Sequence, residues 1–173
     1  MTNSPGSPAT VPLSHVAPDG AARMVDVGDK PITARSATAE GFVRVSAELA
    51  RAIRENSVKK GSVLEVARLA GILAAKRTDE LIPLCHSLPL DAVDVLATLE
   101  KGRVRVTATV RTQSRTGVEM EALTAVSVAC LTVIDMGKAI DKGMSVEGVR
   151  VLEKHGGRSG SYSAAATESE ARA

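Results

Sequence analysis

Two neighbouring stretches decide the fold: VDVLATLEKGRVRVTATV, residues 93–110, and VEMEALTAVSVACLTVIDMGKAIDK, residues 118–142. In the first, apolar residues recur at alternate positions on both sides of the turn EKGR, which predicts an antiparallel hairpin. The second is apolar on nearly every side, so it predicts a helix that is buried on nearly every side. We expect this helix to run from Glu119 to Asp141, about 34 Å at 1.5 Å per residue. In so small a protein, neighbouring subunits are expected to help cover it.

Upstream of the hairpin the chain predicts a short strand, two helices and a loop. Phe42–Val45 alternates weakly, and Ser46 opens a helical stretch, SAELARAIRENS. Ser62 followed by Glu65 is a capping-box signature for a second helix, in which Gly71 lets another backbone come close. LIPLCHSLPL, residues 81–90, contains two prolines and is expected to be an extended loop.

A last strand is predicted around Val149–Leu152. The order strand, helices, strand, strand, helix, strand is that of an α+β ferredoxin-like sandwich, an antiparallel sheet packed on helices. We expect a flexible N-terminal arm over residues 1–22, a single catalytic domain over residues 23–156, and a flexible tail over residues 157–173, because both ends are small and polar.

Composition excludes several functional classes. The chain has 173 residues, of which 44% are apolar and 24% charged, with a net charge of +2. One Phe, one Tyr and no Trp leave almost no platform for stacking nucleic-acid bases. The N-terminus lacks the pattern of a signal peptide, and the longest uncharged apolar run, Ala122–Ile134, is too short to cross a bilayer. With two unpaired cysteines, we expect a cytoplasmic protein that binds neither membranes nor nucleic acid.

Asp135 is the most informative single position, because it interrupts an apolar helix. A lone ionised carboxylate buried there would cost several kcal/mol unless it were paired. Lys138, three residues later, can lie on the same helical face. Two interpretations remain open from the residues alone, an ion pair at the helix end and a functional site.

Other chemical groups gather in three segments. Cys85-His86 in the loop invites a zinc or thiol hypothesis, but three His and two Cys in the whole chain have no metal-type spacing. His86 is either bonded to backbone or available for substrate contact and proton transfer. The segment Arg51–Arg77 has seven basic and two acidic residues, +5 in total, which favours a small polyanion as partner. Glu119 and Glu121 either complement the helix dipole or bind the amino-imine edge of a guanine-like ring.

Four motifs together resemble one family. They are MVDV at residues 24–27, KGSVLEVARLAGILAAKRTDELIPLCHSLPL at residues 60–90, TGVEMEALTAVSVACLTVIDMGKAIDK at residues 116–142, and GGRSG at residues 156–160. This set resembles the molybdenum cofactor biosynthesis protein C family, the cyclic pyranopterin monophosphate synthases. Ser87 and Gly137 depart from the family pattern, in which Pro and Cys are usual, but neither removes a proton-transferring group.

The resemblance implies a lyase with no metal or organic cofactor. Its substrate would be (8S)-3′,8-cyclo-7,8-dihydroguanosine 5′-triphosphate, supplied by a separate radical S-adenosylmethionine GTP cyclase. Its products would be cyclic pyranopterin monophosphate and pyrophosphate. The resemblance also implies a homohexamer, a trimer of dimers, with sites shared between subunits.

The resemblance assigns roles by motif. Asp135, Lys138 and Lys60 match the acid/base group, and we expect both lysines to act mainly as protonated donors, with Asp135 orienting them or accepting a proton. Two substrate-contacting segments of the family are matched, one by Leu84, Cys85 and His86 and the other by Glu119, Met120 and Glu121. A looser part of the match places Lys30, Arg35, Lys76 and Lys154 at positions that hold the triphosphate. Two other functions stay open: a non-catalytic homologue that binds a pterin or nucleotide, and a small RNA-binding protein, against which the lack of aromatic residues argues.

Overall fold

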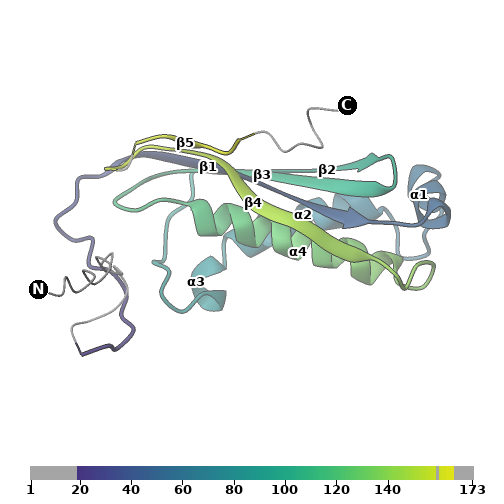
Figure 1. Cartoon of the computed structure of the whole chain (residues 1–173), viewed down its shortest axis with the longest axis horizontal. Helices are drawn as coiled ribbons and strands as arrows, with labels where there is room; N and C mark the ends of the chain where they lie inside the picture. The colour runs from purple at the N-terminus through teal and green to yellow at the C-terminus, as the bar shows by residue number, and fades with distance from the viewer. Residues whose placement is uncertain (1–18, 159, 166–173) are drawn as a thin grey trace, which may run out of the picture.

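The computed structural model describes residues 19–158 and 160–165, and it shows a five-stranded antiparallel sheet with helices on one face (Figure 1). The sheet order is β2-β3-β1-β4-β5. In chain order the elements are β1 (Thr33–Arg44), α1 (Ala47–Arg54), α2 (Val63–Ala75), α3 (Thr78–Leu81), β2 (Ala92–Glu100), β3 (Arg103–Ser114), α4 (Glu119–Gly137), β4 (Ser145–His155) and β5 (Tyr162–Ser163). The expected α+β fold is confirmed, since β2-β3-β1-β4 is the ferredoxin-like strand order. Most of the predicted N-terminal arm lies outside the described residues.

The predicted hairpin is confirmed, whereas the first strand is much longer than expected. β2 pairs with β3 in a register that places Ala92 opposite Arg111 at one end and Glu100 opposite Arg103 at the other. β1 lies at the centre of the sheet, between β3 and β4, and starts nine residues before Phe42. Its alternation is hard to read in the sequence because Glu40, on the face away from the helices, is buried against Arg105 and Arg150. Ala39, Glu40 and Gly41 are therefore all buried in a row.

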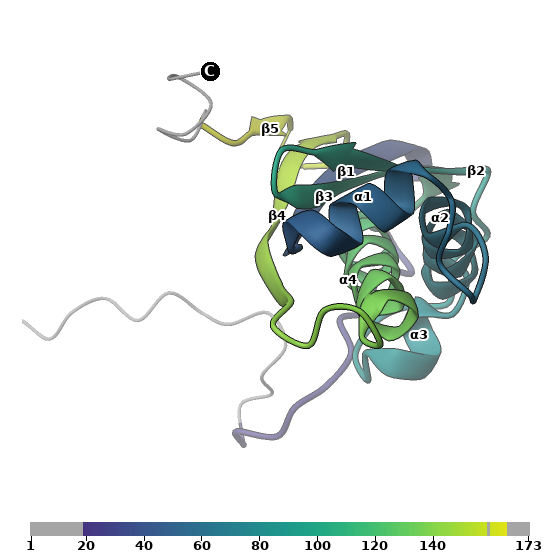
Figure 2. The same cartoon turned by 90° about the vertical axis from the view of Figure 1, so that its right-hand side faces the viewer.

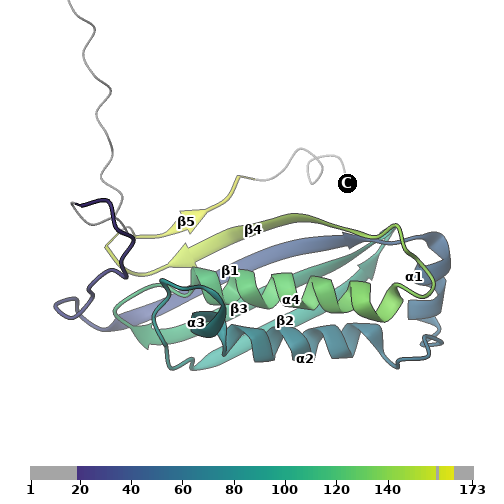
Figure 3. The same ribbon diagram turned by 90° about the horizontal axis from the view of Figure 1, so that it is seen from below.

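The long helix α4 packs beneath the sheet with α2 beside it (Figure 3). It ends at Gly137, one turn earlier than predicted, and Lys138 is its C-cap. A methyl group at Gly71 would lie 2.9 Å from the Ala125 carbonyl oxygen of α4, so the expected close approach of another backbone at this glycine is confirmed. By length and composition alone α4 is long and apolar enough to cross a membrane, but it lies in the core, packed against the sheet and α2.

The two predicted helix starts differ in their caps. Ser46 is the N-cap of α1, where its hydroxyl accepts a hydrogen bond from the Leu49 amide at 3.2 Å. Ser62 is the N-cap of α2, but its side chain makes no capping hydrogen bond. The Glu65 carboxylate instead pairs with Arg68 at 3.0 Å, so the expected capping box is not formed.

Part of the predicted C-terminal tail belongs to the sheet. β5 pairs with the end of β4, Tyr162 opposite Lys154 and Ser163 opposite Glu153. The preceding turn needs glycine, because Gly156 and Gly157 have φ of 93° and 83°. A methyl group at Gly156 would collide with the Ala34 carbonyl oxygen, which places the turn directly against the start of β1.

Candidate active site

The predicted acid/base residues meet at the C-terminal end of α4. The Lys60 ammonium lies 2.7 Å from Asp135 Oδ2 and donates a second hydrogen bond to the Asp135 carbonyl oxygen at 2.8 Å. The Lys138 ammonium lies 2.7 Å from the other carboxylate oxygen, Oδ1. One carboxylate therefore holds two ammonium groups side by side within a single chain.

The expectation that Asp135 is buried is wrong for the single chain. Its side chain is 57% exposed, and those of Lys60 and Lys138 are 48% and 61% exposed. Asp135 lies on the side of α4 that neither the sheet nor α2 covers, which the apolar sequence around it conceals. Hydrogen bonds from Lys138 and then from Lys60 lower the pKa of Asp135 to about 2, so it is ionised at neutral pH.

Helix α1 brings Lys60 to this cluster. After α1 the chain turns sharply, as the Ser57 amide bonds back to the Ala52 carbonyl, and Gly61 has a φ of 98°. The end of α4 also rests on α1, because a methyl group at Gly137 would lie 2.6 Å from Leu49 Cδ2. A side chain at position 137 would therefore require Leu49 to move.

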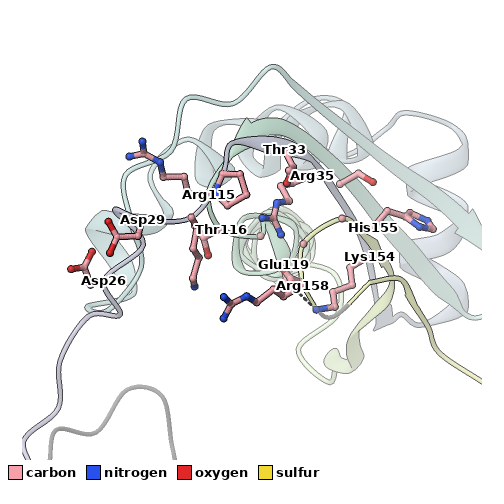
Figure 4. Close-up of a pocket in the computed structure, with 16 residues that line it drawn as sticks. Asp26, Asp29, Thr33, Arg35, Arg115, Thr116, Glu119, Lys154, His155 and Arg158 are labelled. Carbon is pink, nitrogen blue, oxygen red and sulfur yellow. Dashed lines mark ion pairs between the residues drawn. The ribbon is translucent and has the colours of Figure 1, made fainter.

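A cationic pocket of about 650 Å³ lies at the opposite end of the molecule (Figure 4). Its basic residues are Lys30, Arg35, Arg115, Lys154 and Arg158, and its acidic residues are Asp26, Asp29 and Glu119, so cations outnumber carboxylates by five to three. Lys154 and Glu119 form an ion pair at 3.3 Å. Arg35 reaches the pocket beneath the glycine turn, with its Nε buried and without a hydrogen-bond partner among the described residues. Such a site favours a multiply charged anion.

A second cavity of about 410 Å³ adjoins this pocket, and we call it the ring cavity. The two share the residues Lys30, Thr116, Gly117 and Glu119. The other predicted substrate residues that line the ring cavity are Leu84, Cys85, His86, Met120 and Glu121. His86 Nε2 lies 2.8 Å from the Val25 carbonyl oxygen, which joins the motif loop to the N-terminal MVDV segment. His86 is thus bonded to backbone and also lines a cavity.

The carboxyl group of Glu121 is the most unusual titratable group of the ring cavity. The residue is only 4% exposed. Burial, followed by the nearby carboxylates of Glu119 and Asp79, raises its pKa to about 7. Burial also raises the pKa of the Cys85 thiol, which disfavours a thiolate nucleophile.

The two groups of residues do not meet within one chain. Glu119 and Asp135 lie 16 residues apart on the same helix, a separation of about 24 Å at 1.5 Å per residue. The single chain therefore holds the acid/base cluster at one end of α4 and both cavities at the other.

Comparison with known proteins identifies the family. The model of the MoaC family matches residues 24–157, most of the chain. The chain belongs to the MoaC family. Curated relatives named cyclic pyranopterin monophosphate synthase include proteins of Methylobacterium sp. (strain 4-46), 61% identical, and Parvibaculum lavamentivorans, 56% identical, each over 88% of this chain and 96% of the relative. A third, from Streptomyces avermitilis, is 54% identical over 92% of this chain and 94% of the relative.

Within this MoaC-family chain, all but one of the predicted substrate-binding residues line one of the two cavities. Lys76 is separate: it is the C-cap of α2 and lines a different shallow pocket beside Asp91 and Ala92. Sequence reasoning missed Arg115 and Arg158 as pocket residues. Arg115 directly precedes the motif that begins TGVEMEAL, and Arg158 lies within GGRSG. A count of the charged residues in and beside the motifs could have found both.

Proposed function

We infer that this chain is a cyclic pyranopterin monophosphate synthase, a lyase of molybdenum cofactor biosynthesis. Relatives with that name match nearly their whole length at 54–61% identity, which confirms the function expected from the sequence. The observation that carries the proposal is the joint presence of a cationic pocket, an adjoining ring cavity and a paired-lysine carboxylate.

The proposed substrate is (8S)-3′,8-cyclo-7,8-dihydroguanosine 5′-triphosphate, rearranged to cyclic pyranopterin monophosphate with release of pyrophosphate. A radical S-adenosylmethionine GTP cyclase would supply it. The substrate combines a triphosphate with a guanine-derived ring, and the two adjoining cavities offer matching chemistry. Lys30, Arg35 and Lys154, together with Arg115 and Arg158, would neutralise the phosphates and the leaving pyrophosphate.

In the ring cavity, Glu119 and Glu121 would bind the amino-imine edge of the guanine-derived ring, with Leu84 and Met120 against its faces. A neutral Glu121 can donate one hydrogen bond and accept another, whereas an ionised Glu121 can only accept. His86, held by the Val25 carbonyl, would contact the substrate from the loop.

Proton transfers would use the cluster at the other end of α4. Ring opening and reclosure require protons to be delivered and removed in turn. We assign delivery of protons to the ammonium groups of Lys60 and Lys138, and removal of protons to the same groups once they have become neutral amines. The ionised Asp135 holds both groups in place. This assignment agrees with the role expected from the sequence.

The active unit is proposed to be a cytoplasmic homohexamer, a trimer of dimers with sites shared between subunits. The separation of about 24 Å between the cluster and the cavities supports shared sites, because one substrate molecule cannot use both within one chain. The free thiols of Cys85 and Cys130 fit a reducing compartment.

A turnover assay tests the proposed function. Purified protein given the cyclised GTP intermediate should release pyrophosphate and form the cyclic monophosphate without added metal. GTP itself, with the same triphosphate but no bond between C3′ and C8, serves as the control and should not react. Binding of the intermediate without turnover, by protein shown to be folded and assembled, would overturn the synthase proposal in favour of a non-catalytic pterin- or nucleotide-binding protein.

A further inference from the structure

One wall of the ring cavity is an irregular loop. Leu84, Cys85 and His86 line the cavity, and all three belong to the segment at residues 82–91 that joins α3 to β2. α3 itself lies beyond α4, on the side of the helical layer that faces away from the sheet (Figures 1 and 2). A segment without helix or strand bonds presents side chains in a fixed arrangement only where other contacts hold it.

The two ends of this loop are fixed by backbone groups. At its start, the Ile82 amide donates a hydrogen bond to the Thr78 carbonyl oxygen of α3 at 2.9 Å. Near its end, the Thr112 hydroxyl of β3 donates to the Pro89 carbonyl oxygen at 2.5 Å. The residues that line the ring cavity lie between these two anchors, so their arrangement depends on what closes the loop in between.

One hydrogen bond closes the loop around these residues. The Ser87 hydroxyl donates to Oδ2 of Asp79, which lies eight residues earlier in the first turn of α3. We propose that Asp79 is a positioning residue of the synthase, which accepts the Ser87 hydroxyl and so holds the loop at residues 84–86 in place as one wall of the ring cavity. This inference rests on the proposed function, because it assumes that the ring cavity binds the substrate.

The position of Asp79 makes it part of the surroundings of the cavity. After burial and the Glu119 carboxylate, the charge of Asp79 is a further cause of the raised pKa of Glu121. It also contributes, after burial and Glu121, to the raised pKa of the Cys85 thiol. Asp79 is half-buried, and neither it nor Ser87 lines the ring cavity. Asp79 therefore acts on a ligand through the loop and not by contact.

The hydrogen bond between Asp79 and Ser87 connects the two walls of the cavity. The opposite wall is the first turn of α4, with Glu119, Met120 and Glu121. α3 packs against α4, so a loop bonded to α3 is held at a fixed distance from that turn. The hydrogen bond of His86 to the Val25 carbonyl oxygen ties the loop only to the irregular N-terminal segment. The bond to Asp79 is the one that joins the loop to the helical layer.

Hydrogen exchange at the loop tests this closure without reference to activity. The Cys85 amide, which donates to the Ile82 carbonyl oxygen at 3.0 Å, is the reporter. Ser87→Ala and Asp79→Ala should each make it exchange about tenfold faster, because both variants open the loop. Asp79→Asn should restore slow exchange, since its side-chain carbonyl can accept the same hydrogen bond. Glu80→Ala, at the exposed next position of α3, is the matched control and should exchange as the unmodified chain does. Unchanged exchange in Ser87→Ala would overturn the proposal.

Steady-state kinetics test the positioning role. Ser87→Ala should raise KM for the cyclised GTP intermediate about tenfold and leave kcat within about twofold, because a loose loop weakens binding of the ring while the lysine cluster stays intact. This variant keeps the Asp79 charge, so the change in KM reports the loop alone. Faster exchange with an unchanged KM would overturn the positioning role. If the unmodified chain shows no turnover while Ser87→Ala still loosens the loop, the proposed function fails and the closure of the loop by Asp79 stands.

Discussion

At the scale of single residues, Asp135 shows how a correct assignment can come from a partly wrong premise. Its place in an apolar helix led us to expect burial, and burial led us to expect a cationic partner. The carboxylate has two such partners at 2.7 Å, yet it is exposed in the single chain. The sequence identified the helical face correctly, but it does not distinguish a face buried in the core from one that a neighbouring subunit could cover.

We expect Asp135→Asn to reduce turnover about 100-fold or more, the usual size of a general acid/base contribution. The loss should fall mainly on kcat, because the phosphate pocket is at the other end of α4. The melting temperature should change by less than about 2 °C, since exposed ion pairs contribute little to stability. Glu65→Gln, which removes an exposed carboxylate paired with Arg68 at a similar spacing, is the control and should retain full turnover.

The raised pKa of Glu121 predicts that the stability of the folded chain decreases as the pH rises. With its pKa raised from 4.5 to about 7, the folded chain keeps a proton that the unfolded chain has released, so stability falls as the pH rises through that window. We expect this fall in urea unfolding of the unmodified chain, and we expect Glu121→Gln to abolish it. If the free energy of unfolding falls equally with pH in both chains, the raised pKa of Glu121 is contradicted.

At the scale of elements, the close contact between α2 and α4 depends on Gly71, which has no side chain. Small residues in the sequence of α2 indicated a close approach, but they did not show which element approaches. The structure identifies it as α4, at the Ala125 carbonyl. Similarly, the hairpin was predictable because each strand has one buried face. β1 was mostly missed, because its buried Glu40 lies on the face away from the helices and interrupts the alternation.

Gly71→Ala should destabilise the protein although it improves helix propensity by about 1 kcal/mol. The added methyl group would lie 2.9 Å from a backbone oxygen and 3.1 Å from Val95 Cγ1, and overpacking of this kind typically costs about 1–3 kcal/mol. We expect a lower urea midpoint with an unchanged slope. A higher midpoint would show that α2 and α4 can separate without cost.

At the scale of the whole molecule, the sequence predicted the ferredoxin-like sheet order, the packing of helices on the sheet and, with the exception of Lys76, substrate-binding residues that do line the cavities. It could not predict that the cluster and the cavities lie at opposite ends of α4, because a motif fixes which residues occur and not how far apart a folded helix holds them. Nor could it predict β5, whose two residues pair with β4 only because the glycine turn folds back over β1. The separation along α4 is also what makes a second copy necessary in the proposed mechanism.

The most direct test of a site divided between two chains is subunit complementation between Asp135→Asn and Glu121→Ala, in which the alanine leaves neither a donor nor an acceptor. Each variant alone should be nearly inactive, because every site contains one altered residue. After verified subunit exchange, turnover should recover to about a quarter of the unmodified level, since half of the dimers are mixed and each of these holds one intact site. Lys60→Ala mixed with Asp135→Asn should not recover, because both residues belong to the same cluster. Recovery in that control mixture, or none in the first, would contradict the divided site.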